Sequence, residues 1–357
     1  KRSKFIEIPS REKAIFQAVN DLIPGEILLI AGKGHESYQE YINKKFFSDK
    51  KCILQNIKLK NKKLSNDWKL NIIREKIKNI KFSNNKQINL ASINSKEIKK
   101  NDIFFGIKGK KIDGNKYANE AIKKGATFAI VDKIYKGTDT KKIKVKNTLD
   151  LLSSCSKLVR KSSYIKAIAI TGSSGKTSLK ELIAQSLSKI ASTSYSIKSF
   201  NNKYGVPLSL FNIQKKNLFG VFEVGMDRRG EIDKLSKLIM PDLGVITNIS
   251  YAHIKNFNNL SEIASAKSEI IGNIVKGGTI VLNKDDKYFH FLKNKALKKN
   301  LNIISYSKNN EADVKLISMN KKKSKYLLKL KKNNIMKKFF IKENLKSHIS
   351  SILGTIA

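Results

Sequence analysis

Short apolar runs of strand length alternate with stretches of helical spacing through the second half of the chain, from Ala167 onward. The runs lie at residues 167–171, 221–225, 243–247 and 277–283, and the helical stretches lie at 176–190, before Pro241 and at 260–274. Alternating strands and helices are typical of βαβ units. We therefore predict an α/β fold whose main domain, residues 161–357, contains a doubly wound, mostly parallel sheet.

A second, smaller α/β domain is predicted over residues 88–160. Its pattern has strands at 102–107 and 127–131 around a helix at 117–124. The Lys/Asn-rich stretch before it, residues 56–87, shows weak periodicity and is expected to be a linker.

The first segment, residues 1–55, has a pattern of its own. Helical spacing over 11–23 is followed by a Pro-Gly turn and by the apolar run 26–31. This helix and strand predict a partial Rossmann-like segment. Because no Met or leader precedes Lys1, we expect a truncated N-terminus.

Composition narrows the possible functions. The 357 residues carry a formal charge of +43, from 72 Lys and Arg against 29 Asp and Glu, which raises nucleic acid as a partner. The excess is nearly all Lys and accompanies abundant Asn and Ile, which suggests A/T-rich codons, whereas base readers favour Arg. We expect no nucleic-acid partner.

No apolar run approaches the roughly 18 residues of a membrane span, so we expect a cytoplasmic protein without membrane insertion. Two cysteines without a CxxC pair suggest ordinary thiols.

The segment TGSSGKTS, residues 171–178, follows an apolar strand and opens an amphipathic helix. Glycines allow backbone N–H groups to approach phosphate, Lys176 neutralises the terminal phosphates, and the Thr177 hydroxyl can ligate Mg²⁺. The full GxxxxGK[ST] pattern is not met, because Ile170 stands where its first Gly belongs. The alternative is a glycine-rich turn with a solvated lysine. We predict ATP binding by Gly172, Ser173, Ser174, Gly175, Lys176, Thr177 and Ser178.

Five further residues follow or flank the predicted strands. Glu223 ends a strand and could hold Mg²⁺, although such an acid is often only solvated. His253 follows the strand at 243–247, where a single histidine is more often structural. Lys267 lies on the helix at 260–274 and would ordinarily be a surface lysine. Asn283 and Asp286 could reach adenine or ribose, or could simply form a turn.

Taken together, these segments resemble the Mur ligase family, and within it the MurF branch. The resemblance is carried by AIAITGSSGKTSLKE from 167, SFNNKYGVPLSL from 199, FEVGMDRRGEI from 222, PDLGVITNISYAHIKNF from 241, EIASAKSEI from 262 and GGTIVLNKDD from 277. Upstream, NSKEIKKNDIFFGIKGKKIDGNKYANEAIKKGATFAIV from 94 resembles the branch's UDP-substrate domain. The likeness covers roughly residues 88–357.

The resemblance implies an activity and a set of roles. The reaction would add D-alanyl-D-alanine to UDP-N-acetylmuramoyl tripeptide through an acyl phosphate, with ATP and Mg²⁺ as cofactors, in a monomer. Thr177 and Glu223 would hold Mg²⁺, and His253 would join a second metal site. The catalytic residues would be Lys176, His253 and Lys267, and Lys267 would be carbamylated. The substrate side would comprise Ser95, Lys96, Asp113, Gly114 and Asn202. Lys96, Asn115 and Ser351 depart from the family pattern, in which Arg, His and Asn are usual at these positions.

Residues 1–55 instead resemble the end of the third domain of the MurE branch, through PGEILLIAGKGHESYQ from 24. Gly32 and Glu36 would then hold an amino group of a diamino acid. We expect a fused MurE–MurF polypeptide cut at both ends, the alternative being a short extension with a chance glycine loop. Because the family's third domain brings the incoming amine, we expect this fragment to bind ATP and UDP-substrate without forming the amide.

Three other functions stay open at this point. A P-loop switch with a nucleic-acid surface would need an aromatic-rich basic patch beside the P-loop, and no such patch is found in the sequence. A sister ligase resembling MurE or folylpolyglutamate synthase fits the FEVGMDRRGEI string less well. A nucleotide-binding module without ligase activity is compatible with every motif above.

Overall fold

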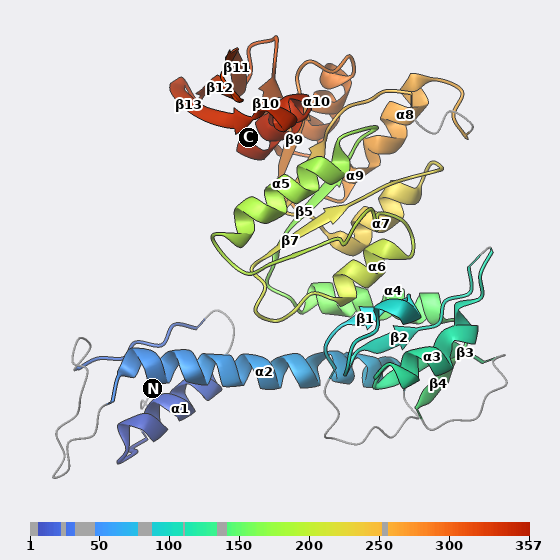
Figure 1. Cartoon of the computed structure of the whole chain (residues 1–357), viewed down its shortest axis with the longest axis vertical. Helices are drawn as coiled ribbons and strands as arrows, with labels where there is room; N and C mark the ends of the chain where they lie inside the picture. Colours follow the sequence, from blue (N-terminus) through green and yellow to red (C-terminus); the bar gives the residue numbers. More distant parts are fainter. Residues whose placement is uncertain are drawn as a thin grey trace.

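The computed structural model describes residues 6–22, 26–32, 47–77, 88–109, 111–133, 141–251 and 256–357, and within 47–77 the side chains of 61–67 are left out. These residues form two sheets and an N-terminal pair of helices (Figure 1). In none of these ranges is a helix both long and apolar enough to cross a membrane.

The larger sheet has nine strands among the described residues. The strands β5 to β11 run parallel to one another, and β12 and β13 are antiparallel additions at one edge. In spatial order the strands are β13 (Ile335–Lys342), β12 (Lys325–Lys332), β11 (Val314–Lys322), β10 (Asn302–Ser307), β9 (Thr279–Asn283), β8 (Leu243–Ile246), β5 (Lys166–Thr171), β7 (Phe219–Glu223) and β6 (Thr193–Tyr195). The strands that follow β5 in the chain lie on both sides of it, β6 and β7 on one side and β8 to β11 on the other, which confirms the doubly wound α/β prediction. The carboxyl end of β5 is therefore the switch point at which such folds bind ligands.

Helices cover both faces of this sheet (Figure 1). One face packs against α5 (Lys176–Ser188) and α11 (Ile349–Ile356). The other packs against α4 (Thr148–Lys161), α6 (Gly205–Phe211), α7 (Glu231–Ile239), α8 (Leu260–Lys267), α9 (Glu269–Gly272) and α10 (Phe289–Lys298). Alternate residues of the strands enter the two clusters, because successive side chains of a strand point to opposite faces. The helix predicted over 260–274 is divided between α8 and α9.

The smaller sheet contains β1 (Ala91–Ser92), β2 (Ile103–Phe105), β3 (Phe128–Asp132) and β4 (Lys142–Val145), all parallel, with α3 (Ala118–Lys123) packed on it. Its edge strand β1 is hydrogen-bonded to a side chain of the larger domain, that of Asn212. Asn212, which follows α6, accepts a hydrogen bond from Ala91 N at 2.7 Å and donates one to Ala91 O at 2.9 Å. The amide of Asn212 thus occupies the place of a further strand at this edge.

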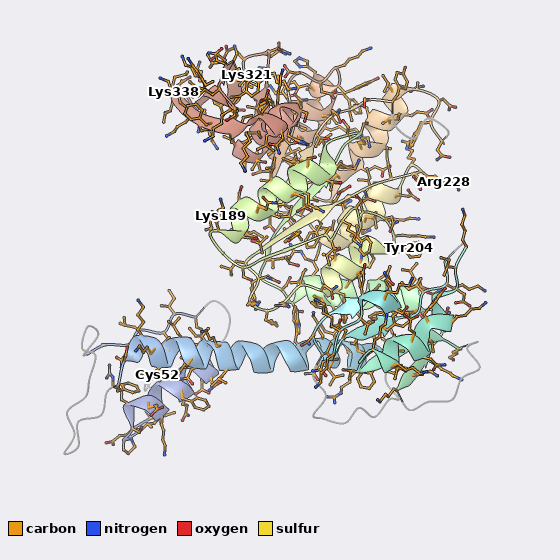
Figure 2. The ribbon with its side chains drawn as sticks, in the orientation of Figure 1. Cys52, Lys189, Tyr204, Arg228, Lys321 and Lys338 are labelled. Carbon is orange, nitrogen blue, oxygen red and sulfur yellow. The ribbon has the colours of Figure 1, made fainter. Side chains whose placement is uncertain are left out.

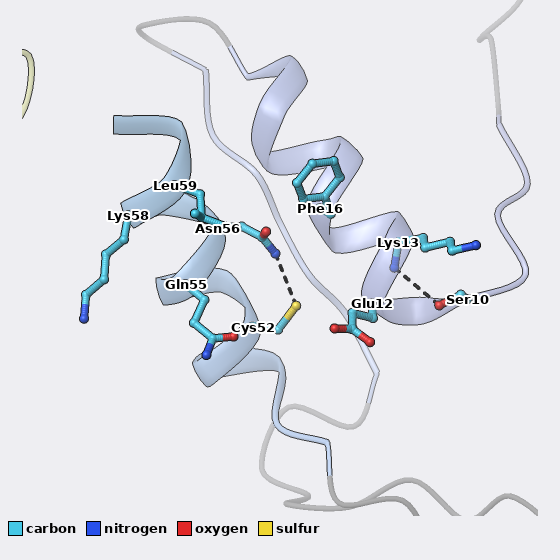
Figure 3. A pocket seen from close by; sticks show the side chains of 9 residues that line it. All are labelled: Ser10, Glu12, Lys13, Phe16, Cys52, Gln55, Asn56, Lys58 and Leu59. Atoms are coloured by element: carbon cyan, nitrogen blue, oxygen red, sulfur yellow. Dashed lines mark hydrogen bonds between the residues drawn. The ribbon is translucent and has the colours of Figure 1, made fainter. Parts of the chain in front are cut away.

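The N-terminal helices are α1 (Arg11–Asp21), capped by Ser10, and α2 (Asp49–Lys76), which carries α1 at one end and reaches the smaller sheet with the other (Figure 1). Between α1 and α2 lies a groove of mixed polar and apolar lining beside Cys52, whose Sγ accepts a hydrogen bond from Asn56 Nδ2 at 3.3 Å (Figure 3). Helix α2 runs across position 55 and through much of the segment expected to be a linker.

The strand predicted at 26–31 is wrong: the described residues 26–32 are extended but pair with no strand in the described part of the chain. Leu28 and Ile30 pack on α1 and α2, whereas Ile27 and Leu29 are 94% and 85% exposed. The apolar alternation is that of a strand, but a strand requires a neighbour to satisfy its backbone.

Candidate functional site

The loop after β5 forms a cradle of backbone groups. Gly172 has φ +146° and Gly175 has φ +76°, both in the region that favours glycine. A Cβ on Gly172 would lie 1.8 Å from Thr247 Oγ1, so any side chain there would collide with the neighbouring strand end. Helix α5 begins at Lys176 without a side-chain cap, so its first N–H groups remain free for a ligand.

The segment after β8 holds this loop in place. Ser173 N donates to Asn248 O and Ser174 N donates to Asn248 Oδ1, both at 2.9 Å. Thr247 Oγ1 donates to Ser174 O at 2.6 Å. The loop conformation is thus fixed before any ligand arrives, which lowers the conformational cost of binding.

A buried carboxylate faces the start of α5. Glu223, at the end of β7, is 1% exposed. Its Oε2 accepts from Thr177 Oγ1 at 2.8 Å and its Oε1 accepts from Asn201 Nδ2 at 2.7 Å. A hydroxyl and a carboxylate are oxygen donors of the kind that Mg²⁺ prefers, and Mg²⁺ is usually bound by one or two such protein groups with water and phosphate completing the shell. The pair therefore fits the predicted metal.

Two lysines converge on a single carbonyl of the loop. Lys176 Nζ lies 2.8 Å from Gly172 O, and Lys267 Nζ lies 3.0 Å from the same oxygen. Lys267 is only 2% exposed, so it is not the surface lysine that its helix position would suggest. Burial and then the nearby Lys176 charge lower the pKa of Lys267 to about 7. Burial also lowers the pKa of Lys176, against the attraction of Glu223.

A polar cavity of about 430 Å³ adjoins the cradle. It is lined by Ser174, Gly175, Ser178, Thr247, Asn248, Asn283, Tyr306, Lys308, Ser347, His348, Ser350 and Ser351. Among the predicted adenine or ribose contacts, Asn283 lies in this lining. The carboxylate of Asp286 instead accepts hydrogen bonds from Ile249 N at 2.6 Å and Tyr288 N at 2.8 Å, and it belongs to a turn.

The predicted substrate residues of the smaller domain are engaged in local contacts. Ser95 Oγ donates to Glu120 Oε2 at 3.0 Å, and the Lys96 side chain is exposed. Asp113 Oδ1 accepts from Asn115 N at 3.0 Å. A Cβ on Gly114 would lie 2.5 Å from Ile107 O, so close backbone approach requires this glycine.

Three other predicted residues belong to the first segment or follow β8 in the sequence. Gly32 is exposed with φ +75°, and its carbonyl accepts from Arg11 Nη2 at 2.9 Å. Glu36 and His253 lie outside the described residues. Within the described residues, no group of three or more His, Cys, Asp and Glu is placed to hold a metal.

The sequence analysis predicted Asn202 as a site residue, but in the structure its neighbour Asn201 is the one that contacts the site. Asn202 Oδ1 accepts from Tyr204 N and Gly205 N and shapes the start of α6. Asn201 is the residue that contacts Glu223. Adjacent residues in a loop can point in opposite directions, and the letters SFNNKYG contain no signal that separates them. Thr247 and Asn248 were also missed as supports of the loop.

The fold and the site define a P-loop α/β protein with a smaller parallel-sheet domain. Residues 170–351 match the family model of the Mur ligase middle domain, and residues 87–159 match that of the Mur ligase family catalytic domain. The chain belongs to the Mur ligase family.

Relatives and solved structures refine this likeness. A UDP-N-acetylmuramoyl-tripeptide–D-alanyl-D-alanine ligase of Rickettsia prowazekii is 38% identical over 229 residues, which are 63% of this chain and 50% of that protein. Crystal structure II of MurF from Acinetobacter baumannii has a TM-score of 0.69 at 25% identity, covering 80% of this chain and 63% of that one. MurF ligase from Thermotoga maritima in complex with ADP shares the fold, with a TM-score of 0.65 at 24% identity over 75% of this chain and 62% of that one. The chain thus spans about half the length of the Rickettsia relative.

Proposed function

We propose that the chain carries the nucleotide and UDP-substrate centre of an ATP-dependent, MurF-like ligase of peptidoglycan precursor synthesis, acting in the cytoplasm. The substrates would be UDP-N-acetylmuramoyl tripeptide and D-alanyl-D-alanine. The observation that carries the proposal is the convergence of Lys176 and Lys267 on Gly172 O beside the Thr177–Glu223 pair. The name of the Rickettsia relative supports the choice of substrates.

Each residue of the cradle has a defined task in this proposal. When bound, Mg·ATP supplies the phosphoryl group that turns the tripeptide carboxylate into an acyl phosphate, which an amine can then attack. The N–H groups at the start of α5, residues 175–178, bind phosphate oxygens, and Lys176 turns from the Gly172 carbonyl toward the terminal phosphates. Thr177 and Glu223 hold Mg²⁺, and Asn201 keeps the Glu223 carboxylate oriented. Asn283 and Ser178 contact the nucleoside.

Lys267 is proposed to be carbamylated. Only a neutral amine adds CO₂, and a pKa of about 7 leaves much of Lys267 neutral at physiological pH. The amine nitrogen forms the new bond to carbon and releases a proton, and the product is an anion. That anion would lie beside Lys176 and would replace the repulsion between the two ammonium groups near Gly172 O by attraction. His253 stays a candidate for a second metal site.

The smaller domain is proposed to bind the UDP-linked substrate, with Ser95, Lys96, Asp113, Gly114 and Asn202 on the substrate side. Residues 1–55 are proposed to be the end of a MurE-like third domain, in which Gly32 and Glu36 would contact a diamino acid. Domain limits at 55, 87 and 160 belong to the same proposal, as does a monomeric state.

The first experiment is calorimetry of the chain with Mg·ATP. Lys176→Ala should weaken binding by about 10- to 100-fold, because a charge-assisted contact to phosphate is lost. Lys189→Ala is the matched control, since Lys189 is exposed one residue beyond α5. Equal ATP affinity in Lys176→Ala and Lys189→Ala would reject the cradle as the nucleotide site.

A second titration separates the MurF-like from the MurE-like assignment. The chain should bind UDP-N-acetylmuramoyl tripeptide more tightly than the corresponding dipeptide, because the third residue carries the carboxylate to be activated. A preference for the dipeptide would assign the smaller domain to the other branch of the family.

A further inference from the structure

The strands β11, β12 and β13 concentrate positive charge on one side of the larger sheet. Residues 314–342 contain eleven lysines and no Asp, Glu or Arg. Strand register divides these residues between two faces, because partners directly opposite each other in an antiparallel pair share a face. The inner face, with Tyr326, Leu328, Leu330 and Ile341, is buried in the cluster that contains α11.

On the outer face, lysines of neighbouring strands lie directly opposite one another. Lys325 lies opposite both Lys342 and Lys322, and Lys329 lies opposite Lys338. We call Lys322, Lys325, Lys329, Lys338 and Lys342 the lysine face. None of the five forms an ion pair with any carboxylate in the described part of the chain. Like charges directly opposite destabilise a sheet, so the isolated fold gains nothing from this arrangement.

Exposed apolar side chains lie among these lysines. Phe340 pairs with Leu327, and Met336 pairs with Lys331, on the same outer face. Phe340 is 59% exposed and Met336 is 49% exposed. Figure 2 labels Lys338 and Lys321 at this end of the molecule, and Figure 1 shows β12 and β13 at the far end from α1 and α2. A cationic surface with apolar side chains between the charges is therefore presented to solvent.

We propose that the lysine face docks on the surface of a bilayer that contains anionic lipids. Lysines beside a membrane are attracted to anionic headgroups, and Phe340 and Met336 would enter the headgroup region, where apolar side chains are removed from water. Single-stranded nucleic acid is the competing polyanion. Its binders add successive aromatic side chains for base stacking, whereas this face offers one aromatic ring beside Met336 and Leu327.

The surface lies outside the proposed ligase chemistry, so its test does not depend on that chemistry. The whole chain is sedimented with vesicles of phosphatidylcholine alone or with phosphatidylglycerol added, at low and high salt. Binding to the anionic vesicles should exceed binding to the neutral ones by about tenfold and should fall at high salt.

The decisive variant is Lys338→Glu/Lys342→Glu, which puts carboxylates opposite Lys329 and Lys325 and so lowers the charge of the face while relieving two repulsive pairs. Vesicle binding should be lost although the melting temperature is kept or raised. The matched control, Lys189→Glu/Lys299→Glu, changes the net charge equally at two exposed lysines elsewhere and should keep binding. Equal loss in both double variants would overturn the proposal, because general charge attraction would then suffice.

Phe340→Ser separates a bilayer from a nucleic acid. It leaves the charge unchanged and should weaken vesicle binding severalfold while leaving the melting temperature near that of the parent. A single-stranded RNA titration runs in parallel. RNA binding tighter than vesicle binding, with no effect of Phe340→Ser on the vesicles, would overturn the membrane assignment.

Discussion

Replacing Lys267 by Met should stabilise the ligand-free protein, kept free of CO₂ so that Lys267 is an uncarbamylated amine, at neutral pH and much less at alkaline pH. The side chain is 2% exposed and its pKa falls from 10.5 to about 7, chiefly through burial. Between these two values the unfolded chain holds the proton that the folded chain has released. Stability therefore rises with pH over this window, and the cost of burying Lys267 is largest below pH 7 and absent above pH 10.5.

The magnitude follows from the two pKa values. Lowering the pKa of Lys267 from 10.5 to about 7 reduces the free energy of unfolding by about 4 kcal/mol at pH 7 and by about 2 kcal/mol at pH 9. Met removes this cost but also removes the hydrogen bond to Gly172 O, worth about 1 kcal/mol. The net gain in the free energy of unfolding should be about 2–3 kcal/mol at pH 7 and about 1 kcal/mol or less at pH 9.

Urea unfolding followed by far-UV circular dichroism measures this difference, with the variant and the parent compared at both pH values. Lys69→Met is an informative companion, because burial also lowers the pKa of Lys69 to about 7 at a site away from the cradle. Lys189→Met, at an exposed position, is the control and should change nothing. A stability gain of equal size at pH 7 and pH 9 would refute the reasoning, since it would not arise from proton release.

Three further outcomes are expected. Gly172→Ala should abolish Mg·ATP binding in calorimetry, because its Cβ would meet Thr247 Oγ1 at 1.8 Å; unchanged affinity would contradict the cradle geometry. Asn212→Ala should destabilise the junction with the smaller sheet by about 1–3 kcal/mol in urea unfolding, because both backbone groups of Ala91 lose their partner. Lys338→Glu alone should raise stability by about 0.2–1 kcal/mol through a new cross-strand pair, and a loss would argue against the register of β12 and β13.

Local patterns predicted the centre of the molecule correctly. The strands at 167–171 and 243–247 and the helix at 176–190 appear as β5, β8 and α5 with small shifts of their ends. They were predictable because a buried parallel strand reads as a continuous apolar run and the glycine-rich turn after it is itself a local signal. The strands near the end of the sequence were not predicted. Strands β11 to β13 are so rich in lysine that their period of two was not recognised.

Sequence alone predicted the α/β class, the order of β5, β7, β8 and β9 with the helices α5 and α7 between them, and the chemistry available in residues 171–178, because these depend on neighbours within a few positions. Tertiary structure decided which groups meet. In the tertiary structure Lys267 is buried against Gly172 O, Asn201 and not Asn202 contacts Glu223, and the apolar run at 26–31 has no neighbouring strand in the described part of the chain. Burial, pKa and pairing depend on contacts between residues far apart in the chain, and no local pattern contains that information.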